Sequence, residues 1–201
     1  MEASVTGFLS RFTLKRVAAV LSSGGVAVLP TDTLYGLHCR AFHPAAVEKI
    51  RMLKRIHEGK GFILLASDFR MVEGLVSHMS GEARKLLARI WPAPLTAILP
   101  STRKIPMNCA LRGRVAIRVP GYNELRSLIT LVGEPLVSTS VNITGQPQLT
   151  RIEEIKKAFP GIDAYLSRPG RKSTVASTIV DFTVHPPRLI RSGRYPWPPK
   201  G

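Results

Sequence analysis

Short apolar runs alternate along the chain with segments whose apolar residues recur at helical spacing. A short apolar run bounded by turn residues predicts a buried strand, whereas apolar positions three and four residues apart predict an amphipathic helix. Strands are therefore predicted at 26–29, 62–66, 95–99, 115–119, 136–140, 163–166, 177–182 and 188–191, and helices at 13–21, 44–54, 68–76, 81–90, 123–132 and 150–159. This order predicts an α/β protein with a sheet flanked by helices, in which antiparallel strands are added in the C-terminal third.

The predicted ends of two helices rest on capping residues. Ser80 stands directly before the segment 81–90 and is a preferred N-cap residue. Thr150 and Glu153 have the T-x-x-E spacing of a capping box at the start of the last helix. The tail from Tyr195 onward is rich in proline and is expected to be extended. We expect a single domain over residues 1–201, with its core at about 14–194 and an extended tail at 195–201.

The stretch 26–37 (VAVLPTDTLYGL) places small polar residues directly after a predicted strand. Pro30 cannot donate a ladder hydrogen bond, so the strand is expected to end there. Thr31, Asp32 and Thr33 then follow at the carboxyl end of the strand, which is the edge where ligands bind in open α/β sheets. Because threonine and aspartate are also common turn residues, this stretch alone fits an ordinary strand and turn equally well.

The net charge of +16, from 29 Lys plus Arg against 13 Asp plus Glu, is the strongest feature of the composition. A strongly basic protein favours polyanions such as nucleotides, RNA or acidic surfaces, although a basic surface can also serve solubility alone. Much of the excess lies in two segments, one with Arg103, Lys104, Arg112, Arg114 and Arg118, and the other with Arg168, Arg171, Lys172, Arg188, Arg191, Arg194 and Lys200.

Neither a membrane segment nor a secretory signal is expected from the sequence. No apolar run approaches the ~18 residues that a membrane helix needs. The N-terminal region has basic residues but lacks the apolar region and cleavage site of a signal peptide. Cys39 and Cys109 are far apart in the sequence and are expected to be free thiols in a reducing cytoplasm.

Several common catalytic motifs are absent from the sequence. It contains no G-x-x-x-x-G-K-[ST] loop, no G-x-G-x-x-G after a strand, no H-E-x-x-H and no G-x-S-x-G. The five histidines are scattered without metal-ligand spacing, so each is expected to be a surface or structural residue. We therefore expect no metal site built from protein side chains.

Hydroxyl, amide and guanidinium side chains recur instead at the ends of predicted strands. The segment 138–142 (STSVN) leaves an apolar strand directly into a loop with glycine and proline. Its hydroxyls, its carboxamide and its backbone N–H groups can surround phosphate oxygens. Arg118 and Arg191 end two other strands, and each supplies a planar fork for a carboxylate or phosphate. The pattern predicts an anion-binding cleft without a P-loop, and the alternative is a set of separate caps and surface arginines.

Taken together, these segments resemble the YrdC/Sua5 family, in its short single-domain form. Six pieces occur in the order seen in that family and span about residues 14–194: VAVLPTDTLYGL, IRMLKRIHEGKGFILLAS, WPAPLT, RVAIRVP, PLVSTSVNITGQP and STIVDFT…RLIRSGR. The resemblance implies a twisted, mixed parallel and antiparallel sheet flanked by helices, with a concave basic surface.

The resemblance also implies an activity, that of a threonylcarbamoyl-AMP synthase serving the t6A modification of tRNA position 37. Such an enzyme is a nucleotidyltransferase that converts L-threonine, bicarbonate or CO2 and ATP, with Mg²⁺, into threonylcarbamoyl-AMP and pyrophosphate. The threonine amine captures CO2, and the resulting carbamate oxygen attacks the α-phosphorus, so no covalent protein nucleophile is needed. The implied partners are ATP, threonine, bicarbonate, tRNA and other proteins of the t6A pathway.

The resemblance assigns roles to named residues of this chain. It implies that the threonine end is held by Thr33, Arg118, Ser138 and Ser177, and that the ATP end is held by Lys54, Lys60, Ser140, Asn142 and Arg191. The family shows a K-x-R motif after the second helix, whereas this chain has Lys54-Arg55-Ile56. The resemblance therefore implies Lys54 and Arg55 as the catalytic cations, with Arg55 or Lys60 covering the charge that the motif's arginine supplies elsewhere.

A second function from another class is also consistent with the sequence: a non-catalytic protein on the same scaffold that binds double-stranded RNA or tRNA. The charge of +16 is large for nucleotide binding alone. Aromatic residues make up only 6% of the chain, so such binding would use the RNA backbone rather than stacked bases. Threonine-dependent release of pyrophosphate would separate the two functions.

Overall fold

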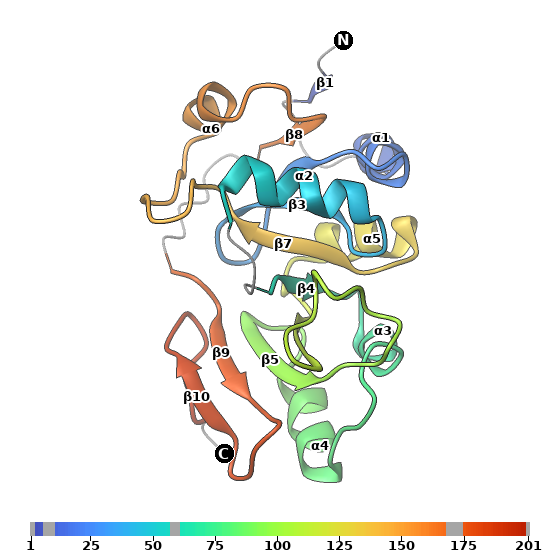
Figure 1. The fold of residues 1–201 in the computed structure, drawn as a ribbon, viewed down its shortest axis with the longest axis vertical. Coiled ribbons are helices and arrows are strands. Elements are labelled where there is room, and N and C mark those ends of the chain that lie inside the picture. Colours follow the sequence, from blue (N-terminus) through green and yellow to red (C-terminus); the bar gives the residue numbers. More distant parts are fainter. Residues whose placement is uncertain (1–2, 6–10, 57–60, 168–174, 200–201) are drawn as a thin grey trace.

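The fold is built on one mixed sheet of ten strands, seen in the computed structural model of the chain (Figure 1). The structure describes residues 3–5, 11–56, 61–167 and 175–199. The strand order is β1-β8-β2-β3-β7-β4-β6-β5-β9-β10. The strands are β1 (Ala3–Val5), β2 (Ala27–Pro30), β3 (Tyr35–Arg40), β4 (Ile63–Leu65), β5 (Leu95–Pro100), β6 (Arg114–Arg118), β7 (Leu136–Ser140), β8 (Ala164–Leu166), β9 (Thr178–Asp181) and β10 (Arg188–Arg191).

The sheet contains both parallel and antiparallel pairs, which confirms the mixed α/β class. Parallel pairs are β1–β8, β2–β8, β4–β6 and β5–β9. Antiparallel pairs are β2–β3, β3–β7, β4–β7, β5–β6 and β9–β10. The expectation that antiparallel strands come only in the C-terminal third is wrong, because β2 already returns as a hairpin through β3. The concave basic surface stays a prediction.

Of the six helices found in the described residues, three begin and end where the sequence predicts. The helices are α1 (Arg11–Ser22), α2 (Pro44–Lys54), α3 (Phe69–Glu73), α4 (Gly81–Ile90), α5 (Asn123–Val132) and α6 (Ile152–Ala158). Ser80 caps α4 as predicted, because its side chain accepts a hydrogen bond from the Ala83 N–H at 3.2 Å. Among the described residues, no helix has both the length and the apolar character needed to cross a membrane.

The predicted capping box of the last helix is wrong. Helix α6 begins at Ile152, so its N-cap is Arg151, and no side chain caps it. Glu153 then occupies the second helical position, where it cannot pair with an N-cap at Thr150 as a capping box requires. Two acidic residues in the first turn, Glu153 and Glu154, still complement the positive end of the helix.

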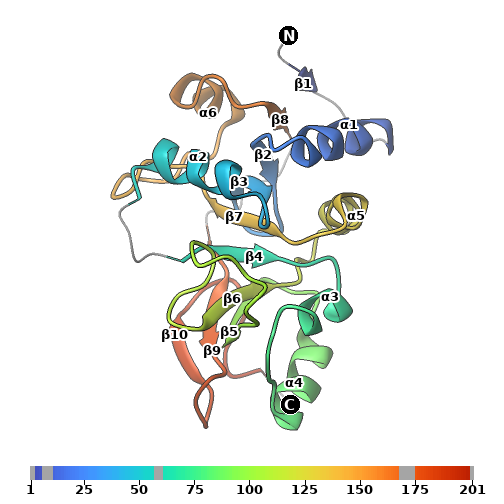
Figure 2. The same ribbon diagram turned by 45° about the vertical axis from the view of Figure 1, so that its right-hand side comes forward.

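Two buried clusters lie on the two faces of the sheet. Helices α1 and α5 pack against β2, β7 and β8 in one cluster. Helices α2, α4 and α6 contribute to the larger cluster, on the opposite face. Figure 2 shows α2 on one side of β3 and β7, and α1 and α5 on the other. Helices α1 and α5 leave the neighbouring strands β5, β6 and β9 uncovered on their face, and a cavity opens there.

The segment after β10 is docked against the sheet. The Arg194 N–H donates to the Ala176 carbonyl at 2.9 Å, and the Tyr195 N–H donates to Thr178 Oγ1 at 3.1 Å. Further along, the ring of Trp197 meets that of Phe182 edge-on, with 5.8 Å between their centroids. The proline-rich tail therefore adds contacts to the start and the end of β9.

Candidate active site

A cavity of about 430 Å³ lies on the uncovered part of the sheet, a size typical of small-ligand sites. Its floor includes Ile98, Ala116 and Ile179, which point away from the main core at alternate positions of β5, β6 and β9. The structure brings together around it most of the residues assigned from the sequence: Thr33, Lys54, Arg118, Ser138, Ser140, Asn142, Ser177 and Arg191. None of the described residues that line it is an aspartate or glutamate.

One wall of the cavity is the turn Thr31–Leu34, which follows β2 and holds itself by its own hydrogen bonds. Thr31 Oγ1 donates to the Leu34 carbonyl at 2.7 Å and accepts from the Thr33 N–H at 3.0 Å. It also accepts from the Leu34 N–H at 3.2 Å. A threonine hydroxyl that satisfies neighbouring backbone groups in this way fixes a turn without the help of a sheet ladder. The turn presents Thr33 Oγ1 to the cavity.

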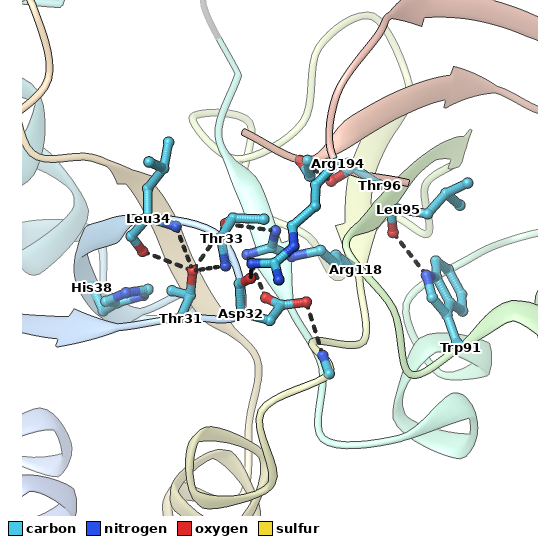
Figure 3. Close-up of polar contacts among 12 residues, drawn as sticks. Thr31, Asp32, Thr33, Leu34, His38, Trp91, Leu95, Thr96, Arg118 and Arg194 are labelled. Atoms are coloured by element: carbon cyan, nitrogen blue, oxygen red, sulfur yellow. Dashed lines mark hydrogen bonds and ion pairs between the residues drawn. The ribbon is translucent and has the colours of Figure 1, made fainter. Parts of the chain in front are cut away.

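Arg118 lies behind this turn and is almost fully buried, with 3% of its surface exposed. Its Nη1 donates to Thr33 Oγ1 at 3.1 Å, and its Nη2 is 3.5 Å from Asp32 Oδ1 (Figure 3). Burial lowers the pKa of the Arg118 guanidinium, Asp32 opposes that change, and Arg191 adds to it. An arginine stays protonated all the same, so a buried positive charge stands at this end of the cavity.

Asp32 is the residue of this group that the sequence did not assign to the site. Its Oδ2 accepts the Gly121 N–H at 2.9 Å, while Oδ1 faces Arg118. The carboxylate therefore ties Arg118, at the end of β6, to the turn after β2. The sequence does show one acidic residue between two threonines at a strand end, which could have marked Asp32 as a site residue. Its pairing with the distant Arg118 is visible only in the folded structure.

Ser177 and Arg191 form a second part of the cavity lining. Arg191 donates from Nε and Nη2 to the Ser177 carbonyl at 3.1 and 2.9 Å, and Nη2 is 3.2 Å from Ser177 Oγ. Ser177 Oγ is also 2.9 Å from Thr96 Oγ1 on β5. Burial lowers the pKa of Arg191. Two guanidinium groups that repel each other, Arg118 and Arg191, therefore line the cavity.

Lys54 ends α2 and holds the loop that follows β7. Its ammonium group donates to the carbonyls of Ser140 and Asn142, and to Asn142 Oδ1 at 2.9 Å. In the reverse direction, the Thr144 N–H and Oγ1 donate to the Lys54 carbonyl at 3.0 and 2.9 Å. Ser140 Oγ donates to Asn142 Oδ1 in turn. The predicted phosphate-binding loop is therefore clamped to one residue at the end of α2.

Two histidines of the elements that flank the site have structural roles, as the sequence predicts. His38 is fully buried on β3, its Nδ1 lies 3.2 Å from the Val137 carbonyl, and burial lowers its pKa to about 3, so that it is neutral at pH 7. His43 caps α2, where its side chain accepts a hydrogen bond from the Ala46 N–H. In the described part of the chain, no group of three or more His, Cys, Asp and Glu is placed to hold a metal ion.

The chain is similar to known proteins over most of its length. The family model for Sua5, YciO and YrdC, described as telomere recombination, matches residues 19–193. The chain belongs to this family. It is 38% identical over 173 residues to a protein of Chromobacterium violaceum named threonylcarbamoyl-AMP synthase, covering 84% of this chain and 88% of that one.

Relatives of the Sua5/YciO/YrdC family with solved structures share the fold. The crystal structure of Pyrococcus abyssi Sua5 complexed with L-threonine matches with a TM-score of 0.88 at 29% identity, covering 96% of this chain and 57% of that one. The Escherichia coli YciO structure matches with a TM-score of 0.83 at 26% identity, covering 92% of this chain and 90% of that one. This chain thus spans a little over half of the Pyrococcus protein.

The departure from the family's K-x-R motif has a structural counterpart. Ile56 lines the cavity, whereas Arg55 is exposed and is not among the lining residues. Arg55 is the C-cap of α2 in the left-handed conformation, with φ 51° and ψ 48°. Its role as a catalytic cation stays a prediction, to which this placement adds no support. Lys60, the other basic residue considered, lies outside the described residues.

We expect the substitution Arg55→Gly to raise the free energy of unfolding by about 0.5–1 kcal/mol, because glycine adopts the left-handed region without a steric penalty. Turnover should change little, since the Arg55 side chain lies outside the cavity wall. Urea denaturation and a pyrophosphate-release assay measure the two effects. A fall in turnover of about 10- to 1000-fold would instead support the catalytic role inferred from the sequence.

Proposed function

We propose that the chain is a threonylcarbamoyl-AMP synthase, which makes threonylcarbamoyl-AMP and pyrophosphate from L-threonine, bicarbonate or CO2, and ATP. The observation that carries this proposal is the cavity lined by two arginines and several hydroxyl groups, in a chain 38% identical to a protein with that name. The Pyrococcus relative of known structure, which was complexed with L-threonine, supports the same substrate.

The charge balance of the cavity supports an anionic substrate. Arg118 and Arg191 both line it, and Asp32 is the charge partner of the first of them. A carboxylate between the two guanidinium groups would relieve their repulsion and accept charge-assisted hydrogen bonds. Thr33, Ser138 and Ser177 supply the hydroxyl groups that could bind the amino group and side-chain hydroxyl of threonine. We therefore assign the threonine carboxylate to the neighbourhood of Arg118.

The clamped loop after β7 supports a triphosphate at the other end. Ser140 and Asn142 line the cavity, and Lys54 brings a positive charge against them. With hydroxyl and amide groups but no carboxylate among the described lining residues, this end suits a Mg²⁺ ion that arrives bound to ATP. Such an ion would offset the charge of the triphosphate, with Ser140 and Asn142 as the nearest protein oxygens.

Catalysis in such a site consists mainly of orientation and electrostatic stabilisation. The carbamate oxygen of N-carboxythreonine forms a bond to the α-phosphorus as the bond to the pyrophosphate oxygen breaks. The threonine-end residues hold the nucleophile on one side, and the loop at 140–142 with Lys54 and Arg191 stabilises the leaving group on the other. We thus place the chain among the nucleotidyltransferases, without a covalent intermediate on the protein.

Release of pyrophosphate from ATP tests the proposal directly. We expect release to require both threonine and bicarbonate and to be absent with either alone. Release that is independent of threonine would contradict the proposal. Binding of duplex RNA that weakens steeply with salt, in a protein that releases no pyrophosphate, would favour the RNA-binding alternative.

The substitutions Ser140→Ala and Arg191→Ala together should weaken ATP binding by roughly tenfold to a hundredfold, the usual cost of losing a charge-assisted contact. Calorimetry with ATP in the absence of threonine measures this effect. Arg188→Ala is the matched control, because Arg188 lies on the same strand but faces Asp181 and does not line the cavity. Equal ATP affinity in the double variant and the control would refute the assignment of the triphosphate to this loop.

The product would then serve the modification of tRNA. We propose that threonylcarbamoyl-AMP passes to other proteins of the t6A pathway, and that the charge of +16 assists contact with tRNA. Threonylcarbamoylation of tRNA in a mixture of this protein with the later enzymes of the pathway would test the first statement. Retention of tRNA at low salt tests the second.

A further inference from the structure

The segment after β10 passes so close to the start of β9 that only a glycine fits at position 193. A Cβ atom added to Gly193 would lie 2.4 Å from both the Ser177 carbonyl carbon and the Thr178 nitrogen, which are backbone atoms that cannot move aside independently. This close approach allows the Arg194 N–H to reach the Ala176 carbonyl. The position of Arg194 is therefore set by main-chain contacts directly beside Ser177, one of the residues that line the cavity.

From this position the Arg194 side chain reaches the turn Thr31–Leu34. Its Nη1 donates to the Asp32 carbonyl at 2.8 Å, and Figure 3 shows the side chain extending toward Asp32 and Thr33. The same peptide group, between Asp32 and Thr33, donates its N–H to Thr31 Oγ1. Arg194 and Thr31 thus hold the two ends of one peptide group. With the plane of that peptide fixed, the Cα atom from which the Thr33 side chain leaves is fixed as well, within reach of the two contacts of Thr33 Oγ1, to Thr31 Oγ1 at 2.9 Å and Arg118 Nη1 at 3.1 Å.

We propose that Arg194 is a positioning residue for substrate binding, which locks the Asp32–Thr33 peptide so that Thr33 Oγ1 is aimed into the cavity. The inference rests on the proposed function, in which Thr33 contacts threonine. Arg194 follows immediately after the stretch matched by the family model, which ends at residue 193. It acts through the main chain of the turn and does not itself line the cavity.

The position of the contact predicts which step it serves. Arg194 bonds to the turn at the threonine end, whereas the triphosphate is assigned to the loop at 140–142, which Lys54 holds. Loss of the Arg194 side chain should therefore weaken the binding of threonine and leave the affinity for ATP unchanged. Because Arg194 is exposed, its substitution should not create a buried cavity or an uncompensated buried charge.

The test compares Arg194→Met, which keeps the length of the side chain but has no donor, with Arg194→Lys, which keeps one charged donor. Arg89→Met is the matched control, since Arg89 is an exposed arginine of α4 that does not line the cavity. For each variant we would measure KM for threonine, kcat, the dissociation constant for ATP without threonine, and the midpoint of thermal unfolding.

We expect Arg194→Met to raise KM for threonine roughly tenfold, the lower end of the cost of a charge-assisted hydrogen bond. ATP affinity and thermal stability should stay as in the unsubstituted protein, and Arg194→Lys should recover most of the threonine affinity. Unchanged KM in Arg194→Met, equal KM in the Met and Lys variants, or a parallel loss of ATP affinity and stability would each overturn the inference. If the proposed function itself were wrong, the unsubstituted protein would already show it, because its release of pyrophosphate would not depend on threonine.

Discussion

Replacing Arg118 with methionine should lower threonine-dependent turnover by about 10²- to 10³-fold, the scale on which enzymes lose activity when one positioned charge is removed. The same change should also destabilise the fold by roughly 3–5 kcal/mol, because it leaves the carboxylate of Asp32 buried without its partner. Asp32 is 4% exposed, so water cannot replace the guanidinium there. Steady-state kinetics and urea denaturation measure the two losses separately.

The double substitution Asp32→Asn with Arg118→Met is the control that separates the two effects. It removes the charge of both partners, and the asparagine keeps an acceptor for the Gly121 N–H. Stability should return most of the way toward that of the unsubstituted protein, while turnover should stay low, because the substrate carboxylate still lacks Arg118. Recovery of turnover in the double variant would show that Arg118 serves only to compensate Asp32.

Much of the fold could be predicted because, in most elements, the local pattern of apolar and polar residues matches the helix or strand that the residues form. Helices α2, α4 and α5 have clear apolar faces, with proline or a capping serine at the start of two of them. Strand β7 is an apolar stretch that ends in serine and threonine. Strand β3 was missed because its sequence, YGLHCR, mixes glycine, histidine and arginine with tyrosine, leucine and cysteine. The pairing of β3 with both β2 and β7 forms this strand, and that pairing is a tertiary feature.

The membership of the site was more predictable than the roles within it. Thr33, Arg118, Ser138 and Ser177 stand out as polar residues at strand ends, and the fold brings those ends to one cavity. Arg118 pairs with Asp32, which is 86 positions away in the sequence, and Arg194 bonds to the Asp32 carbonyl from 162 positions away. No local sequence pattern could predict contacts between residues so far apart. Ile56 could be recognised as a departure from the family motif, but the sequence could not say that Arg55 would cap a helix in the left-handed conformation.

Lys54 provides the second large expected effect, because one ammonium group holds three acceptors of the loop after β7. The substitution Lys54→Met should lower the free energy of unfolding by about 2–3 kcal/mol, since it leaves three partly buried acceptors without a charged donor. Turnover should fall by roughly 10²- to 10³-fold, because both the charge near the triphosphate and the shape of its loop are lost. Urea denaturation, ATP calorimetry and pyrophosphate release should therefore all change together.

Thr144→Val is the matched control for Lys54→Met. It removes the hydroxyl bond to the Lys54 carbonyl but leaves the ammonium group and its three acceptors in place. We expect this variant to lose only about 1 kcal/mol of stability, the usual net value of one hydrogen bond, and to keep nearly all of its turnover. If Lys54→Met lost stability but kept both ATP affinity and turnover, Lys54 would be a structural clamp alone. The ammonium group of Lys54 contacts the two residues assigned to the triphosphate. We therefore expect the opposite result, in which Lys54→Met loses stability, ATP affinity and turnover together.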